Sequence, residues 1–347
     1  MDFDPSFYKG KKVLVTGHTG FKGSWMSALL VNAGAEVIGY SIDESPLFEL
    51  SGLIDQVISI KGDVRNLAHM KEVFDEYNPE IVIHMAAQPL VRRSYREPVM
   101  TFETNVMGTV NILECVRLNP CVKSFLNVTT DKVYENKERE QGYTEEEPLD
   151  GYDPYSNSKS CSELVTHSYK KSFFSEGQTA ISTARAGNVI GGGDFAADRI
   201  IPDCVRAAVK GEDIIVRNPY SIRPYQHVLE PVYAYLMIAA KQYDDDSYSG
   251  YYNVGPDDKD CIKTGELVDL FVKNWGDGLK WIDRYDGGPH EAAFLKLDCT
   301  KLKNTFDWAP RWDIEKAVAK TVEWTKIWNS GLSVRDCMDK QIREFTG

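Results

Sequence analysis

A tyrosine and a lysine four residues apart have the clearest capacity for chemistry in this sequence. Tyr155 and Lys159 form a Tyr-x-x-x-Lys pair. On a helix, residues at positions i and i+4 share one face, with Cβ atoms about 5–6 Å apart. An ammonium group beside a phenol stabilises the phenolate, whose reference pKa is about 10. The spacing therefore predicts a tyrosine base that removes the proton of an alcohol or sugar hydroxyl, although an exposed helix pair has the same pattern.

A glycine-rich segment predicts where a dinucleotide binds. Residues 16–23 read Thr-Gly-His-Thr-Gly-Phe-Lys-Gly, between an apolar strand and a helical pattern. Such glycines let the backbone turn sharply and approach a pyrophosphate at the helix N-terminus. An ordinary strand–helix turn is the alternative. The predicted cofactor-binding residues of this loop are Gly17, His18, Thr19, Gly20, Phe21, Lys22 and Gly23.

Two side chains in this loop are larger than usual. His18 and Lys22 stand where small or apolar residues are typical. An imidazole here would crowd the cofactor, whereas the lysine would add a phosphate contact. The alternative is that both side chains point to solvent.

The ends of the next strands predict the rest of the cofactor site. Ser41 stands where an acid usually binds the adenosine ribose, and Asp43 follows two residues later. The nearest arginine, Arg65, lies after the third strand, so we expect NAD rather than NADP. Four further residues are predicted to flank the adenine or to lie along the cofactor: Asp63, Val64, Ala86 and Ala87.

The elements that must position these residues alternate along the first half of the chain. Apolar strands near 11–18, 36–40, 57–60, 81–85 and 125–129 are separated by helical patterns such as 21–33, 66–77 and 103–117. This alternation predicts an α/β domain with a doubly wound parallel sheet. After about residue 186 the rhythm breaks. We expect a dinucleotide-binding domain over 1–187, with a contribution from about 225–257, and a smaller mixed α/β substrate domain over 188–347.

Composition excludes several classes of protein. The chain has 347 residues, is 42% hydrophobic and carries a net charge of −12, which argues against disorder and against nucleic-acid binding. No apolar run reaches the ~18–20 residues of a membrane helix, and the acidic N-terminus does not resemble a signal peptide. Seven dispersed cysteines are typical of reduced thiols in a cytoplasmic enzyme, without a metal site or disulfides.

These motifs together resemble the extended short-chain dehydrogenase/reductase superfamily, a Rossmann-type fold, and its nucleotide-sugar branch. The resemblance covers nearly the whole chain. It is carried by residues 16–23, Asp63, 84–87, 104–105, 130–131 and the Tyr155/Lys159 pair. Thr130-Asp131-Lys132 replaces the Thr-Asp-Glu of other 4,6-dehydratases. This tripeptide, together with residues 16–25, 185–194 and 223–228, resembles the corresponding segments of the 4,6-dehydratases that act on CDP-D-glucose. The cytidine preference follows from this resemblance alone.

The resemblance implies a reaction without net redox change, of the kind used in deoxysugar biosynthesis for O-antigen or lipopolysaccharide. NAD would oxidise carbon 4 of the sugar, water would leave across carbons 5 and 6, and carbon 6 would be reduced. Tyr155 would be the base at the 4-hydroxyl, aligned by Thr130. Asp131 would be the general acid and Lys132 the general base, each requiring a shifted pKa. Alternatively, Lys132 only stabilises an enolate through its positive charge or forms an ion pair.

The resemblance also implies substrate contacts and partners. Arg223 would hold the diphosphate bidentately. Arg93, Ser94, Asn188 and His290 would contact the nucleotide sugar, although each has a structural alternative. Helices over 106–117 and 155–174 would pair in a homodimer, with a tetramer assembled from such dimers as the alternative. A nucleotide-sugar 4-epimerase, a dehydratase for another nucleotide sugar and a non-catalytic NAD(P)-sensing protein remain the alternative functions.

Overall fold

A seven-stranded parallel sheet forms the centre of the computed structural model, which describes residues 3–43, 45–174, 177–285 and 294–347. Its order is β11-β6-β5-β4-β1-β2-β3, and every neighbouring pair is parallel. The predicted doubly wound sheet is confirmed. The strands are β1 (Lys12–Thr16), β2 (Glu36–Ser41), β3 (Ile58–Lys61), β4 (Ile81–His84), β5 (Ser124–Thr130), β6 (Ala180–Ala186) and β11 (Tyr251–Val254).

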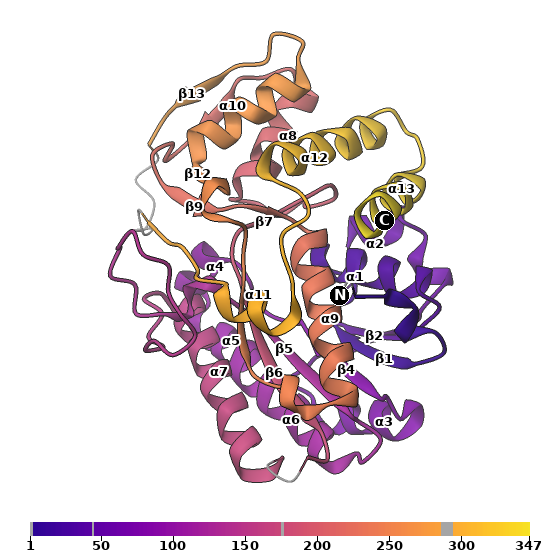
Figure 1. Cartoon of the computed structure of the whole chain (residues 1–347). Coiled ribbons are helices and arrows are strands. Elements are labelled where there is room, and N and C mark those ends of the chain that lie inside the picture. The colour runs from indigo at the N-terminus through magenta and orange to yellow at the C-terminus, as the bar shows by residue number, and fades with distance from the viewer. Residues whose placement is uncertain (1–2, 44, 175–176, 286–293) are drawn as a thin grey trace.

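Helices cover both faces of this sheet (Figure 1). Side chains alternate along β1, because Val13 and Val15 join one buried cluster and Leu14 joins another. The first cluster contains α1 (Phe21–Asn32), α9 (Leu229–Asp244) and α13 (Val334–Thr346). The second contains α3 (Leu67–Tyr77) and α6 (Gly108–Leu118), and α7 (Pro154–Phe173) packs beside α6. Strands with two buried faces explain the continuous apolar runs of the sequence.

Capping residues begin and end the helices that matter for the site. Asn66 accepts a hydrogen bond from the His69 backbone N–H at 3.2 Å, and Gly34 follows α1 with φ of 80°. Asp153 caps α7 by accepting from the Ser156 backbone N–H at 3.0 Å. This cap places Tyr155 in the first turn of α7.

The helix predicted over 103–117 is confirmed, and it contains a turn of a wider type. The structure has α5 (Pro98–Phe102), a π-helical turn at Glu103–Met107 and then α6. Asn105 lies in that turn, and its side chain accepts from the Gln88 backbone N–H at 2.8 Å and donates to the Ser158 hydroxyl at 2.8 Å. These long-range bonds accompany the wider turn, a type that is common at functional sites.

A smaller group of elements lies at the carboxyl ends of the strands, in the upper part of Figure 1. It has its own buried cluster, which includes Ile201, Phe271 and Val318. Its elements are β7 (Val189–Ile190), α8 (Ile200–Lys210), β8 (Ile214–Val216), β9 (Ile222–Pro224), β10 (Gln226–His227), β12 (Cys261–Lys263), α10 (Thr264–Trp275), β13 (Trp281–Asp283) and α12 (Ile314–Asn329). Between β10 and β12 the chain leaves this smaller group: α9 packs on the main sheet and β11 forms its edge strand. The chain then returns to the smaller group. The remaining helices are α2 (Pro46–Leu50), α4 (Val91–Arg96) and α11 (Thr300–Phe306).

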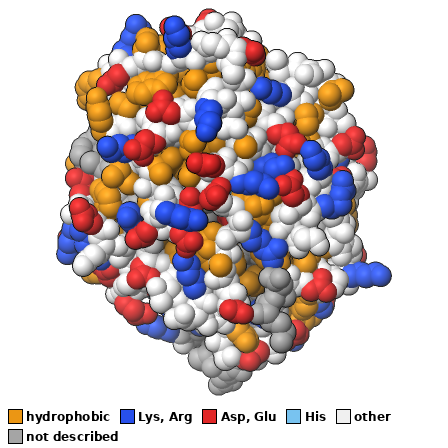
Figure 2. Space-filling model, turned by 45° about the horizontal axis from the view of Figure 1, so that its top comes forward, with side chains coloured by type: hydrophobic (Ala, Val, Ile, Leu, Met, Phe, Trp, Pro, Cys, Tyr) orange, Lys and Arg blue, Asp and Glu red, His pale blue; other side chains and the backbone are white. Residues whose placement is uncertain are grey.

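The surface carries both signs of charge despite the net charge of −12. Acidic and basic side chains are interspersed on the face that Figure 2 shows. Among the described helices, none is long and apolar enough to cross a membrane.

Candidate active site

The glycine loop lies between β1 and α1, at the point where the strand order reverses between β1 and β4. A Cβ on Gly17 would come within 2.9 Å of the Ala86 backbone nitrogen, and one on Gly23 within 2.1 Å of the Gly17 carbonyl oxygen. Gly20 stands at the N-cap of α1 and offers no side chain to its first N–H groups. The N–H groups at the start of α1 and the glycine backbone without side chains fit a pyrophosphate. This glycine cradle, residues 16–23, therefore suits a dinucleotide.

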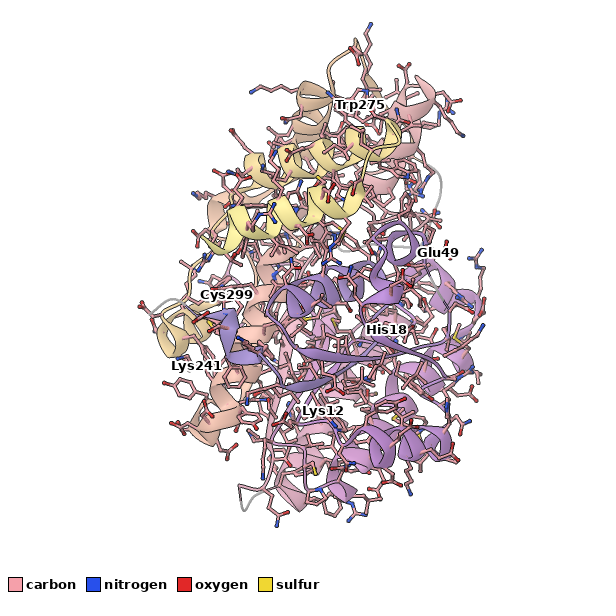
Figure 3. All side chains as sticks on the ribbon, turned by 90° about the vertical axis from the view of Figure 1, so that its right-hand side faces the viewer. Lys12, His18, Glu49, Lys241, Trp275 and Cys299 are labelled. Carbon is pink, nitrogen blue, oxygen red and sulfur yellow. The ribbon has the colours of Figure 1, made fainter. Side chains whose placement is uncertain are left out.

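His18 does not point to solvent, which corrects one of the two predicted alternatives. The side chain is fully buried, and it lies among the N-terminal elements in Figure 3. Its Nδ1 lies 2.9 Å from the Ser41 hydroxyl and its Nε2 lies 2.8 Å from the Ser59 hydroxyl. The ring fills the space above Gly39, where a Cβ would be 2.2 Å away. Burial lowers the pKa of His18 to about 4, so the imidazole is neutral at pH 7.

Lys22 faces the opposite way, toward the reacting end of the cleft. Its Nζ lies 6.0 Å from the centre of the Tyr235 ring. Burial and the charge of Arg199 lower the pKa of Lys22 to about 8, and Asp131 partly opposes them. Lys22 thus brings positive charge close to the predicted catalytic carboxyl. The alternative that it points to solvent is wrong, because the side chain is largely buried.

The residues predicted to bind the adenosine end lie together after β2 and β3. Thr19 links them to the loop, because its hydroxyl donates to the Asp43 carbonyl at 2.6 Å and its N–H donates to Ser41 at 3.4 Å. The Asp43 carboxylate is exposed and pairs with Lys61 at 3.5 Å. Val64 is buried, and its carbonyl accepts from Asn111 at 2.9 Å. The group is arranged around one end of the cradle.

Arg65 is engaged by two carboxylates. Its guanidinium contacts Asp63 at 2.6 Å and Glu103 at 3.3 Å. The hydrogen bond to Arg65 lowers the pKa of Asp63. A guanidinium held in this way offers little attraction to a ribose phosphate.

Tyr155 and Lys159 share one face of α7, as predicted. Lys159 is buried, and its ammonium donates to the Val128 carbonyl at 3.0 Å. Burial and the charge of Lys22 lower the pKa of Lys159 to about 7, while Glu163 raises it. Burial raises the pKa of Tyr155 to about 12, despite a hydrogen bond with Thr130 that lowers it. The expected lowering of this pKa is therefore absent in the free protein, because loss of hydration outweighs the nearby positive charge.

Thr130, Asp131 and Lys132 form the turn that ends β5. Asp131 is fully buried. Its Oδ1 accepts from the Thr130 hydroxyl at 2.9 Å and from Lys132 Nζ at 3.1 Å. Lys132 also donates to the Asn188 side-chain oxygen at 3.3 Å. The structure thus brings together three predicted catalytic residues and one predicted substrate residue.

The other carboxylate oxygen of Asp131 faces Gly187. Its Oδ2 is buried and has no hydrogen-bond partner among the described residues. A Cβ on Gly187 would lie 3.2 Å from this oxygen and 2.7 Å from Pro224 Cγ. Because Gly187 lacks a side chain, the backbone keeps room in front of a carboxyl group that is free to exchange a proton with a ligand.

The predicted substrate residues are not all placed together. Arg93 is partly exposed and pairs with Glu97 at 3.0 Å, and the Ser94 hydroxyl donates to the Val91 carbonyl within α4. Arg223 is buried in β9, and its guanidinium donates to the Ile222 carbonyl at 2.9 Å. His290 lies outside the described residues. The roles of these residues remain predictions.

Sequence reasoning missed Arg199. Its guanidinium pairs with Asp194 at 3.0 Å, and its charge lowers the pKa values of both Lys22 and Tyr155. The only signal in the sequence was an arginine five residues beyond the Gly-Gly-Gly-Asp run. The smaller group of elements thereby supplies positive charge to the cleft.

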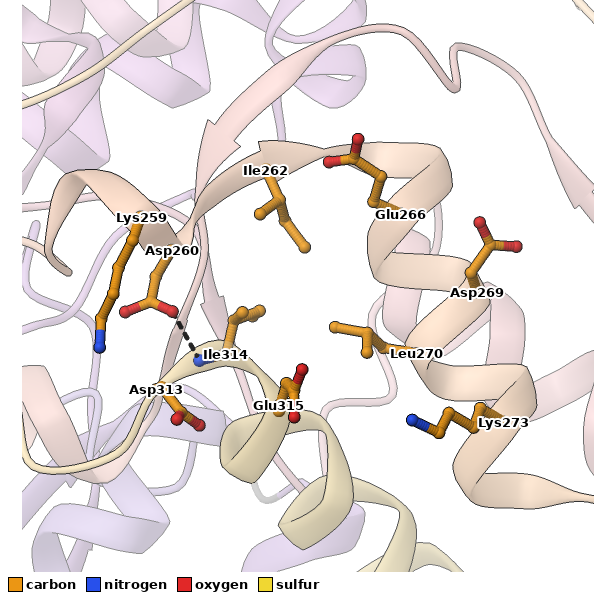
Figure 4. A pocket seen from close by; sticks show the side chains of 10 residues that line it. All are labelled: Lys259, Asp260, Ile262, Glu266, Asp269, Leu270, Lys273, Asp313, Ile314 and Glu315. Carbon is orange, nitrogen blue, oxygen red and sulfur yellow. Dashed lines mark hydrogen bonds between the residues drawn. The ribbon is translucent and has the colours of Figure 1, made fainter.

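A separate pocket of about 510 Å³ lies between α10 and α12 (Figure 4). Asp260 accepts from the Ile314 backbone N–H there at 3.1 Å. Two lysines face five acidic side chains, Asp260, Glu266, Asp269, Asp313 and Glu315. This excess of negative charge would repel a diphosphate, so the pocket is not a second nucleotide site.

Comparisons with known proteins agree with this geometry. The chain is 45% identical to a CDP-glucose 4,6-dehydratase of Salmonella typhimurium, over 99% of this chain and 98% of that protein. It is 26% identical to a dTDP-glucose 4,6-dehydratase of Haemophilus influenzae, over 92% of this chain and 99% of that one.

Solved structures share the fold. One is a dTDP-glucose 4,6-dehydratase of Bacillus anthracis in complex with NAD, with a TM-score of 0.79, 23% identity and coverage of 93% of this chain and 99% of that chain. Another is a UDP-glucose 4-epimerase of Thermotoga maritima, with a TM-score of 0.80, 22% identity and coverage of 90% and 98%. Residues 14–321 match the family described as GDP-mannose 4,6-dehydratase. The chain belongs to this family, and its predicted resemblance to nucleotide-sugar 4,6-dehydratases is confirmed.

Proposed function

We propose that this protein converts CDP-D-glucose to CDP-4-keto-6-deoxy-D-glucose and water, using a bound NAD. The observation that carries the proposal is the Thr130-Asp131-Lys132 turn, with its buried Asp131, beside Tyr155 and Lys159, in a chain 45% identical to a CDP-glucose 4,6-dehydratase. A 4-epimerase needs the tyrosine and lysine, but it has no use for an acid and a base at carbons 5 and 6. The proposed role is a step in deoxysugar biosynthesis of the O-antigen or lipopolysaccharide type.

In the first step, Tyr155 takes the proton of the 4-hydroxyl through its phenolic oxygen, and Thr130 holds that hydroxyl in line. A bound nicotinamide ring would accept the hydride of carbon 4 and return it to carbon 6, and the positive charge of its oxidised form would favour ionisation of the phenol. Lys159 holds its ammonium on the Val128 carbonyl, on the same helix face as Tyr155. The charge of the oxidised ring would oppose the burial that raises the pKa of Tyr155 in the free protein.

The elimination uses the turn after β5. The 4-ketone acidifies the proton of carbon 5, which Lys132 removes. Asp131 gives a proton to the departing 6-hydroxyl, and water leaves. The 3.1 Å pair between these residues lets a proton taken by the lysine pass to the carboxyl group. The elimination starts from the tautomer of this pair in which Asp131 holds the proton and Lys132 is neutral, and the transfer restores that tautomer. When carbon 6 is reduced, carbon 5 regains a proton, and the proton that Tyr155 took from the 4-hydroxyl balances it.

NAD is preferred to NADP because of the two carboxylates that hold Arg65. Arg65 is also the nearest arginine to the predicted ribose end of the site. The residues proposed to bind the dinucleotide are those of the glycine loop with Ser41, Asp43, Asp63, Val64, Ala86, Ala87, Tyr155 and Lys159. Arg93, Ser94, Asn188, Arg223 and His290 remain proposed contacts of the nucleotide sugar.

The proposal includes a cytoplasmic homodimer, with a tetramer of two such dimers as the alternative. Helices α5, α6 and α7 pack together on one side of the sheet and expose large apolar side chains. These are Val99, Met107, Leu118, Leu164 and Phe173, each at least half exposed. The seven cysteines are free, as is usual in a reducing compartment.

The test is turnover of four donors, CDP-, dTDP-, GDP- and UDP-glucose, with and without added NAD⁺. We expect the alkaline ultraviolet absorption of a 4-keto-6-deoxy sugar, and the highest kcat/KM with CDP-glucose. Deuterium at carbon 4 should appear in the methyl group of the product. A 4-epimer without methyl deuterium would instead identify an epimerase, and a higher kcat/KM for another donor would reassign the substrate.

A further inference from the structure

Tyr235 is a buried tyrosine whose hydroxyl has no hydrogen-bond partner. It lies on α9 and is 0% exposed, and its Oη has no partner among the described residues. Leaving a buried polar group unsatisfied destabilises a protein, and a phenylalanine would fill the same volume without that penalty. An unpaired group of this kind therefore calls for an explanation outside the free protein.

The surroundings of Tyr235 belong to the reacting end of the cleft. Its ring lies 6.0 Å from Nζ of Lys22, the second residue of α1 beyond the glycine cradle. The charges of Tyr155 and Asp131, together with burial, raise the pKa of Tyr235 well above its usual range, so the hydroxyl keeps its proton and is a donor. Asp131 supplies a second buried and unpaired atom, its Oδ2. Two of the buried atoms without a partner among the described residues thus lie where the dinucleotide and the sugar must meet.

We propose that the Tyr235 hydroxyl is a cofactor-binding group, which donates a hydrogen bond to a carbonyl-type acceptor on the reactive end of the bound dinucleotide. A primary carboxamide has this chemistry. The dinucleotide is favoured over the sugar because Lys22, the neighbour of the ring, extends from the phosphate-binding turn. The proposal rests on the proposed function, and it adds a residue from the second half of the chain that no motif in the sequence indicates.

A matched control is available in Tyr8, which is equally buried. Its hydroxyl donates to the Leu236 carbonyl at 2.7 Å, one residue from Tyr235 on the same helix. Tyr8→Phe removes a satisfied hydrogen bond, whereas Tyr235→Phe removes an unsatisfied hydroxyl. Both changes delete a single oxygen atom and keep the ring.

The experiment measures thermal unfolding and Kd for NAD⁺ and NADH, using protein from which retained dinucleotide has been removed. For Tyr235→Phe we expect a Tm no lower than that of the parent, and Kd values raised about tenfold for both dinucleotides. For Tyr8→Phe we expect a lower Tm and unchanged Kd values. Neither readout requires turnover.

A second arm measures CDP-glucose binding to each NADH-loaded protein, since reduced dinucleotide cannot oxidise carbon 4. Weakened sugar binding with unchanged dinucleotide Kd values in Tyr235→Phe would overturn the proposal and assign the acceptor to the sugar. A Tm that falls as in Tyr8→Phe would also overturn it, because the hydroxyl would then have a partner in the free protein. Failure of the parent itself to bind NAD⁺ would count against the proposed function instead.

Discussion

Asp131 combines full burial, one oxygen in an ion pair and one oxygen without a partner. This asymmetry suits a group that must hold its orientation while giving a proton to a leaving hydroxyl. The pair with Lys132 fixes one oxygen, and the other keeps its hydrogen-bonding capacity unused beside Gly187, which has no side chain.

Replacing Asp131 tests whether its carboxyl group is the acid of the elimination step. In Asp131→Asn we expect oxidation of carbon 4 to continue, because Tyr155 and Lys159 are unchanged, while the 6-hydroxyl is no longer protonated. Reduced cofactor should accumulate at 340 nm, and formation of the deoxy product should fall by about 100-fold or more. Normal product formation would show that Asp131 is not the acid.

Lys132→Met is the companion variant, and its readout is exchange of the carbon-5 proton with heavy water. Loss of exchange is expected if Lys132 is the base. Normal exchange would leave Lys132 only its ion pair with Asp131 and its bond to Asn188.

At the scale of the element, α7 carries the catalytic pair and is tied to the sheet by a buried carboxylate one turn beyond Lys159. Glu163 accepts from Thr129 on β5 at 2.5 Å and from Thr183 on β6 at 2.7 Å, and it pairs with Arg185 at 3.0 Å. Burial acts to raise the pKa of Glu163, but Arg185 and these hydrogen bonds lower it to about 2. Glu163 thereby fixes the position of α7 on the sheet near Val128 and Thr130.

Removing this charge should destabilise the fold. In Glu163→Gln we expect the free energy of unfolding to fall by about 3–5 kcal/mol, because Arg185 is left buried without a counter-charge. Urea denaturation measures the change. The double variant Glu163→Gln/Arg185→Met should recover part of the loss, since it removes the unpaired charge as well. A single variant within about 1 kcal/mol of the parent would show that the pair contributes little to stability.

For the whole molecule, three buried histidines predict sensitivity to acid. Burial lowers the pKa values of His18 to about 4, and of His84 and His227 to about 3. These values lie below the unfolded reference of about 6.5, so the unfolded chain binds more protons and stability falls as the pH drops below 6.5. Glu230 opposes this trend, because burial raises its pKa to about 7.

Between pH 6.5 and 5, each of the three histidines should lower the free energy of unfolding by about 2 kcal/mol. Glu230 should raise it by about the amount that one histidine lowers it, so the net loss is about 4 kcal/mol. Urea denaturation at the two pH values measures this loss. His227→Phe is the test variant, since its ring lies between Trp25 and Trp312 and its Nε2 has no partner among the described residues. Its pH slope should be smaller by about 1.4 kcal/mol per pH unit. An unchanged slope would show that His227 is not neutral in the folded protein.

The exposed apolar side chains on α5, α6 and α7 lead to a prediction about assembly. In Leu164→Glu we expect sedimentation velocity to show a shift toward monomer, because a carboxylate would be buried in the proposed two-fold interface. Leu332→Glu is the matched control. Leu332 is 64% exposed and follows α12, far from these helices in the fold, whereas Leu164 is 53% exposed. Equal effects of both substitutions would place the interface elsewhere.

The sequence by itself determined the doubly wound sheet, the glycine cradle and the Tyr155/Lys159 pair. These features depend on local rules: apolar runs bounded by turns, a glycine pattern between strand and helix, and the i, i+4 spacing. Helix ends marked by local signals, such as Asn66 and Gly34, were also predictable. The helix over 103–117 was predicted as well, but its π-helical turn was not, because the bonds from Asn105 that accompany this turn reach residues distant in the sequence.

Only the tertiary structure decided how charged and polar groups from distant segments act on one another. It placed His18 inside the protein against Gly39, turned Lys22 toward Asp131, and brought Arg199 and Tyr235 to the same cleft. It also raised the pKa of Tyr155, where the spacing alone predicted a lowered one. The physical reason is that burial and electrostatic interaction depend on distances in space, and residues far apart in the sequence set those distances.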